Sequence, residues 1–244
     1  MKQRIIPGLI AAVVLMVSPL SRADTLYLTS LEWPPYSGED LPSQGASIAV
    51  AKAAFDAMGH ELVVEFYPWS RAVALATNND KYAGYFPEYY YESDEFLFSD
   101  PMGQGPLGFV ENVDNPIEWN SLDDLTDETI GVVQDYVNTE ELDRMIADGD
   151  INASAVTSDS QNVLKVAGGR IDMAVIDSNV LGYLLENDPK VDMAIGKVQM
   201  NDKLLVEKDL YIAFKNNANG QQWRDIFNEG LTQIDIDAIM AEHM

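Results

Sequence analysis

The 244-residue sequence contains no cysteine and only two histidines. Without cysteine the chain forms no disulfide bonds, so the stability of its fold must come from packing. His60 follows the end of an expected helix and His243 lies near the last residue, and neither belongs to a metal-ligand spacing or a Ser/His/Asp arrangement. We therefore expect neither a metal ion nor a cofactor.

Basic residues are scarce, since 15 lysines and arginines stand against 40 aspartates and glutamates, for a formal charge of −25 at pH 7. A surface this acidic repels nucleic acid and anionic lipid, so we expect neither as a partner. Two explanations for the acidity stay open. One is a solvated acidic surface, such as suits a salty habitat, and the other is steering of a cationic ligand, which salt would screen.

Long apolar runs are missing except near the start. Lys2 and Arg4 precede an apolar run at residues 5–17, and residues 21–23 place small side chains where a signal peptidase reads. The run is too short to span a membrane, and no later stretch reaches about 20 apolar residues. We expect residues 1–23 to be an export signal.

Removal of this signal takes away three basic residues and no acid, so the formal charge falls from −25 to −28. No cysteine follows the expected cleavage site to carry a lipid anchor. We therefore expect a periplasmic protein without stable membrane insertion.

Strand-like and helix-like patterns alternate along the rest of the chain. Almost continuous apolar runs are typical of buried parallel strands, and apolar residues at helical spacing predict helices packed on them. A polar, acidic stretch at residues 111–128 separates two such series, and a final amphipathic helix at 220–232 returns to the first. We expect an α/β protein with lobe I at residues 24–110 plus 211–244, lobe II at 111–210, and two crossings near 107–110 and 210–214.

One aromatic turn follows the first expected strand, in the sequence Leu-Glu-Trp-Pro-Pro-Tyr at residues 31–36. The two prolines hold the backbone in an extended, non-helical path, which presents the rings of Trp33 and Tyr36 where a core strand has just ended. Such a turn forms a rigid wall for a small ligand, or alternatively a cap on the hydrophobic core.

Polar and aromatic residues also follow the next two expected strands. Trp69 and Arg71 come after the second strand, and Glu88 and Tyr90 come after the third. Because the carboxyl ends of parallel strands meet at one edge of a sheet, these residues should converge with Trp33 on a pocket.

Several short motifs, in their order and spacing, resemble family 3 of the bacterial extracellular solute-binding proteins, the amino-acid-binding periplasmic receptors of ABC transporters. The resemblance implies a two-lobed periplasmic-binding-protein (Venus flytrap, type II) fold that closes on a small molecule, a monomer, and an ABC transporter permease as partner. It also implies that Trp33 and Trp69 stack on the ligand and that Asp177 binds an α-ammonium group. The motifs are Trp33-Pro34-Pro35-Tyr36, Pro68-Trp69, Phe98-Ser99-Asp100-Pro101, Leu122-Asp123-Asp124-Leu125, Ile130 to Gln134, and Gly169-Arg170-Ile171-Asp172.

The sequence departs from the family where an α-carboxylate would be held. Residues 92–95 contain no cation at the place of the usual arginine, and Asp135 stands at a helix start that would otherwise welcome an anion. Arg71 is the only arginine near an expected strand end of lobe I, where it either grips a carboxylate or turns outward to pair with an acid such as Glu32. Asp177 also suits a helix N-cap, which is compatible with ligand contact.

Glu88, Asp135 and Asp177 beside Trp33 and Trp69 predict an acidic pocket with aromatic walls, suited to a cationic or amine-bearing ligand. We expect a binding protein rather than an enzyme. The alternatives are a dehydratase-like enzyme on the same fold, with Glu88 as a carboxyl group of raised pKa, and a receptor that presents its ligand to a membrane sensor.

Overall fold

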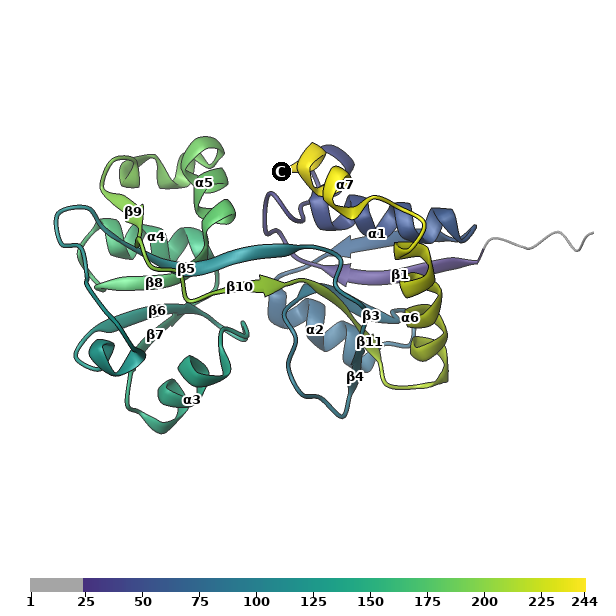
Figure 1. Cartoon of the computed structure of the whole chain (residues 1–244), viewed down its shortest axis with the longest axis horizontal. Helices are drawn as coiled ribbons and strands as arrows, with labels where there is room; N and C mark the ends of the chain where they lie inside the picture. The colour runs from purple at the N-terminus through teal and green to yellow at the C-terminus, as the bar shows by residue number, and fades with distance from the viewer. Residues whose placement is uncertain (1–23) are drawn as a thin grey trace, which may run out of the picture.

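The computed structural model describes residues 24–244, and the expected export signal at residues 1–23 lies outside the described residues. The described chain forms two α/β lobes that lie side by side and are joined by two neighbouring strands, β5 and β10 (Figure 1). The chain enters the second lobe through β5 and leaves it through β10, so both termini of the described chain belong to the first lobe.

Lobe I is built on a five-stranded sheet in the order β2-β1-β3-β11-β4, in which β1 runs parallel to β2 and β3 while β11 is antiparallel to β3 and β4. Helix α1 packs against α6 and α7, and α2 packs on β1 and β3. The elements are β1 (Thr25–Ser30), α1 (Ala46–Ala57), β2 (Glu61–Phe66), α2 (Trp69–Asn78), β3 (Gly84–Glu88), β4 (Phe96–Phe98), β11 (Tyr211–Lys215), α6 (Ala218–Leu231) and α7 (Ile236–His243).

Lobe II is built on a second sheet in the order β10-β5-β8-β6-β7, with β9 paired to β5. Strand β6 is parallel to β7 and β8, while β5 is antiparallel to β8, β9 and β10. The elements are β5 (Gln104–Asn112), β6 (Thr129–Val133), α3 (Glu140–Asp148), β7 (Asn152–Val156), α4 (Asp159–Ala167), β8 (Met173–Asp177), α5 (Ser178–Asn187), β9 (Val198–Met200) and β10 (Val206–Asp209), with short 3₁₀ turns at Pro42–Gln44, Leu122–Leu125 and Pro189–Ala194.

The two crossings between the lobes are hydrogen-bonded to each other. Asp209 at the end of β10 pairs with Gln104 at the start of β5, and the ladder continues toward lobe I as Leu210 N–H donates to the Gly103 carbonyl at 2.8 Å and Met102 N–H to the Leu210 carbonyl at 2.9 Å. The connection therefore behaves as a two-stranded ribbon rather than as two independent linkers.

The expected boundary between residues 110 and 111 falls inside β5, and the expected crossing at 107–110 pairs entirely with strands of lobe II. The chain passes between the lobes earlier, near Gly103, because the apolar run at 107–110 is buried in the second sheet. The other expected crossing, at 210–214, corresponds mostly to β11 of lobe I, and the connecting strand is β10.

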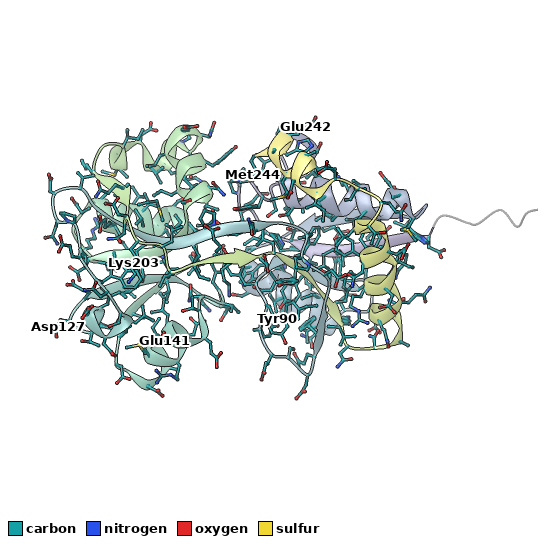
Figure 2. The ribbon with its side chains drawn as sticks, viewed as in Figure 1. Tyr90, Asp127, Glu141, Lys203, Glu242 and Met244 are labelled. Atoms are coloured by element: carbon teal, nitrogen blue, oxygen red, sulfur yellow. The ribbon has the colours of Figure 1, made fainter. Side chains whose placement is uncertain are left out.

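Acidic side chains lie on the outside of both lobes, as with Asp127 and Glu141 on lobe II and Glu242 on lobe I (Figure 2). In residues 24–244 no helix is both long enough and apolar enough to cross a membrane.

Candidate ligand-binding site

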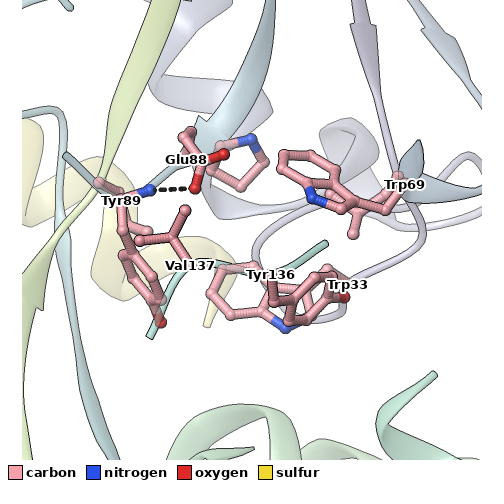
Figure 3. A pocket seen from close by; sticks show the side chains of 9 residues that line it. Trp33, Trp69, Glu88, Tyr89, Tyr136 and Val137 are labelled. Carbon is pink, nitrogen blue, oxygen red and sulfur yellow. Dashed lines mark hydrogen bonds between the residues drawn. The ribbon is translucent and has the colours of Figure 1, made fainter. Parts of the chain in front are cut away.

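A small cavity of about 30 Å³ lies between the lobes, beside the connecting strands (Figure 3). Lobe I contributes the turn after β1, the start of α2 and the end of β3, so the three strand ends do converge. Lobe II contributes the loop after β6, and Leu210 comes from the connection. The lining residues are Leu31, Trp33, Trp69, Pro87, Glu88, Tyr89, Tyr136, Val137 and Leu210.

Trp33 is held in place by its own turn. Its backbone N–H donates to the Ser37 carbonyl at 2.8 Å, and its ring stacks on Tyr36 with centroids 4.6 Å apart and planes at 24°. The edge of Tyr89 meets it at 6.1 Å. Trp33 therefore lines the cavity, while both rings also belong to the buried hydrophobic core.

Trp69 is held by both lobes. Its indole N–H donates to the Asp135 carbonyl of lobe II at 2.9 Å, and its ring meets Tyr85 at 5.3 Å and Tyr136 at 5.9 Å, both edge-on. Movement of one lobe away from the other would therefore remove two of the contacts that orient this ring.

Glu88 ends β3 with a buried carboxyl group that lines the cavity. One oxygen, Oε1, accepts a hydrogen bond of 2.7 Å from the Tyr89 N–H, as Figure 3 shows. Burial raises the pKa of Glu88 to about 8, against the lowering effects of the Tyr89 N–H, the Lys208 ammonium and the Tyr85 hydroxyl. Lys208 itself lies over the Tyr89 ring at 4.9 Å.

A second, wider cavity of about 360 Å³ adjoins the first and shares its walls Leu31, Trp33, Trp69 and Tyr136. On the lobe II side it is lined by the start of α4, including Asp159, whose side chain is 8% exposed. Burial, and then the nearby Asp177 carboxylate, raise the pKa of Asp159 to about 7, although the Tyr136 hydroxyl acts in the opposite direction. The exposed acids Glu32 and Glu39 line the side of lobe I.

The lobes also meet at a buried contact beside β5. The Tyr36 hydroxyl of lobe I donates to Asp177 Oδ2 at 3.1 Å, and the Asn179 side-chain amide donates to the Tyr36 oxygen at 2.9 Å. Asp177 Oδ1 caps α5 by accepting from the N–H groups of Asn179 and Val180. Gly105 lies against this contact, and a β-carbon there would overlap both Tyr36 Oη and Asp177 Oδ2.

Of the residues expected at the site, Trp33, Trp69 and Glu88 line the smaller cavity. Tyr36 lies behind Trp33 and is fully buried, and Asp177 is 1% exposed with its oxygens engaged by Tyr36 and α5, so neither lines a cavity. The expectation of an N-cap at Asp177 is confirmed.

The other three expected residues lie outside the cavities. Asp135 is exposed and accepts hydrogen bonds from Trp69 and, through Oδ2, from the Ser70 hydroxyl. Arg71 is exposed with its guanidinium over the Tyr67 ring at 5.0 Å, so the interpretation that it turns outward holds, although its neighbour is an aromatic ring and not Glu32.

Tyr90 is 56% exposed and packs on Phe98 and Tyr211 at the surface of lobe I (Figure 2). It lines neither cavity, because its ring packs on the outer surface of lobe I, while Glu88 and Tyr89 take the inward positions.

Sequence reasoning missed Tyr89, Tyr136 and Asp159. Asp159 follows the end of β7, so the strand-end argument applied to lobe II would have found it. Tyr136 follows β6 and Tyr89 follows β3 in the same way, but nothing in the sequence distinguishes Tyr89 from Tyr90. Across residues 24–244, no group of three or more His, Cys, Asp or Glu side chains is arranged to hold a metal ion.

No family model matches the sequence, and no curated protein does. Solved structures match over almost the whole described chain. The ligand-binding core of GluR0 from Nostoc punctiforme in complex with L-glutamate is 19% identical, with a TM-score of 0.69, covering 89% of this chain and 96% of that one.

A histidine kinase sensor domain with similarity to periplasmic binding proteins is 16% identical, with a TM-score of 0.77, covering 91% of this chain and 97% of that one. An ancestral arginine-binding protein bound to arginine is 18% identical, with a TM-score of 0.71, covering 90% and 96%. The chain therefore has the α/β, two-lobed periplasmic-binding-protein fold of type II with two hinge crossings, as the sequence predicts.

Proposed function

We propose that the protein is a periplasmic solute-binding protein that captures a small cationic or amine-bearing molecule between its lobes and delivers it to an ABC transporter. The proposal depends on the charge of the cavity lining. Every charged side chain that lines the two adjoining cavities is a carboxylate, and these acids are Glu32, Glu39, Glu88 and Asp159.

The aromatic walls fit the same ligand. Trp33, Trp69, Tyr89 and Tyr136 surround the smaller cavity, and a cation over such rings gains about 0.5–1 kcal/mol at an exposed site and about 2 kcal/mol when it is desolvated. Arginine-binding and glutamate-binding neighbours show that this fold accepts ligands with charged groups.

Among the described residues, the lining of the two cavities offers no cation to pair with a carboxylate group of a ligand. No lysine or arginine of residues 24–244 lines either cavity, and Arg71, the arginine expected to serve, lies outside them. A standard amino acid would leave its carboxylate beside Glu88 or Asp159, where like charges repel. The proposed ligand is therefore an amine or amidine without an α-carboxylate.

Capture follows from closure of the lobes. Trp69 and Tyr136 meet from opposite lobes at the cavity wall, so the complete site exists only in the closed conformation. A ligand that touches both walls shifts the open-to-closed equilibrium, and its affinity depends on that equilibrium as well as on its contacts.

Isothermal titration calorimetry against amines, dicarboxylates and neutral sugars tests the proposal. We expect amines alone to bind, with affinity that falls about tenfold or more between pH 8 and pH 6, because Glu88 and Asp159 take up protons and lose the charge that holds the cation. Glu88→Gln should weaken amine binding, and Glu92→Gln, an exposed acid on the same lobe, is the matched control. Preference for a dicarboxylate or a sugar would overturn the proposal.

The protein is proposed to bind without chemical turnover. Glu88 lines the cavity with a pKa of about 8, which would suit proton transfer and is the specific ground for the enzyme alternative. Product analysis after prolonged incubation with each bound amine decides between a binding protein and an enzyme. If a product forms, and Glu88→Gln abolishes its formation while the amine still binds, the protein is an enzyme. A permease gene beside the gene of this protein would support transport, whereas a sensor kinase gene would favour ligand presentation.

A further inference from the structure

Two buried carboxyl groups approach the shared aromatic walls from opposite lobes. Glu88 lies at the end of β3 in lobe I and is 6% exposed, and Asp159 lies at the start of α4 in lobe II and is 8% exposed. Glu88 lines the smaller cavity and Asp159 the wider one, and the two cavities meet at Tyr136, whose hydroxyl pKa both acids raise. The two acids therefore line adjoining cavities that share their aromatic walls.

Neither carboxyl group forms an ion pair within the described part of the chain. Lys208 attracts Glu88, but its ammonium lies over the Tyr89 ring and burial lowers its pKa. The charged group that acts most strongly on Asp159 is Asp177, which is another acid. Each carboxylate thus lacks the partner that a buried charge requires, and each would gain one from a bound cation.

A third polar group beside the cavity also lacks a partner. The Tyr89 hydroxyl is buried without a hydrogen bond in a side chain that is 7% exposed, and in Figure 3 it points away from Glu88. Burial raises its pKa, and the charges of Asp177, Asp159 and Glu88 act in the same direction. A hydrogen-bond donor of a ligand would satisfy this oxygen.

Apolar and aromatic surfaces separate the two acids. Both cavities are lined by Leu31, Trp33 and Tyr136, and none of these side chains carries a charge. We infer that the site, taken as the cation site proposed above, selects a dication, in which one ammonium or amidinium group pairs with Glu88, a second pairs with Asp159, and a short alkyl spacer lies along Trp33 and Tyr136.

The test is calorimetry at pH 8 with butylamine, 1,4-diaminobutane, 1,5-diaminopentane and 1,6-diaminohexane. A second charge-assisted contact is worth about 1.5–3 kcal/mol, so the best diamine should bind about 10- to 100-fold more tightly than butylamine. The diamine series should show an optimum length, since the spacer must match the separation of the two acids.

Glu88→Gln and Asp159→Asn should each reduce the diamine preference to about twofold or less, while Asp150→Asn, an exposed acid of lobe II, should leave it unchanged. The double variant should lose no more preference than either single variant, because a preference for two charges requires both acids. Circular dichroism of each variant confirms that the fold is retained.

Equal affinity for butylamine and every diamine would overturn the dication inference and leave the cation site standing. Failure of every amine to bind would overturn both the inference and the proposed function.

Discussion

Glu88→Gln should make the ligand-free protein more stable at neutral pH, although it removes a residue of the candidate site. Burial raises the pKa of Glu88 from 4.5 to about 8, so the folded protein keeps a proton that the unfolded chain has released. Between these two values the native state binds more protons than the unfolded state. The stabilisation is complete below pH 4.5 and is lost as the pH rises through 8.

The magnitude follows from the shift, at about 1.36 kcal/mol for each pKa unit. Complete ionisation of Glu88 lowers the free energy of unfolding by about 5 kcal/mol, and at pH 7 the free energy of unfolding is already lower by about 3 kcal/mol. Glutamine keeps the shape and cannot ionise, so Glu88→Gln should raise the melting temperature at pH 7 by about 6–12 °C for a protein of this size. At pH 4.5 the two proteins should melt at the same temperature.

Differential scanning calorimetry of both proteins from pH 4.5 to 8 measures this difference, and Glu92→Gln supplies the control for loss of an exposed charge. Destabilisation by Glu88→Gln that grows from pH 4.5 to pH 8 would refute the reasoning, because it would mean that the carboxylate is paired in the folded state. A gain in stability coupled to loss of ligand binding is the trade-off expected of a preformed binding group.

Three further predictions concern the contacts between the lobes. Tyr36→Phe leaves the buried Asp177 Oδ2 without its donor and should lower the free energy of unfolding in urea by about 1–3 kcal/mol, whereas an unchanged midpoint would contradict the assigned contact. Ser70→Ala removes a hydrogen bond to Asp135 across the cleft and should weaken ligand binding about fivefold while the urea midpoint stays constant. Gly105→Ala should hold the lobes apart and enlarge the radius of gyration in small-angle X-ray scattering, and a wild-type radius would count against the closed contact beside β5.

Much of the fold follows from local patterns in the sequence. Continuous apolar runs predict buried strands such as β1 and β6, and helical spacing of apolar residues predicts helices such as α1, because each buries a continuous apolar face. Strand β10 could not be predicted in this way, because its sequence Val-Glu-Lys-Asp has no apolar periodicity and the strand is ordered by pairing with β5.

The site is predictable where the strand-end rule applies and not where partners are distant in sequence. Trp33, Trp69 and Glu88 follow strand ends and line the cavity. Nothing local indicates that Tyr36 would bond to Asp177, 141 positions away, and so leave the ligand surface. That contact depends on how the two lobes close.

The most direct test of the central claim is mass spectrometry of the small molecules that co-purify with the native protein, released by denaturation and recorded in both ion modes. The account predicts an amine or amidine carrying positive charge and lacking an α-carboxylate, in about one copy per protein. A dicarboxylate, a standard amino acid or a neutral sugar retained at that level would contradict it.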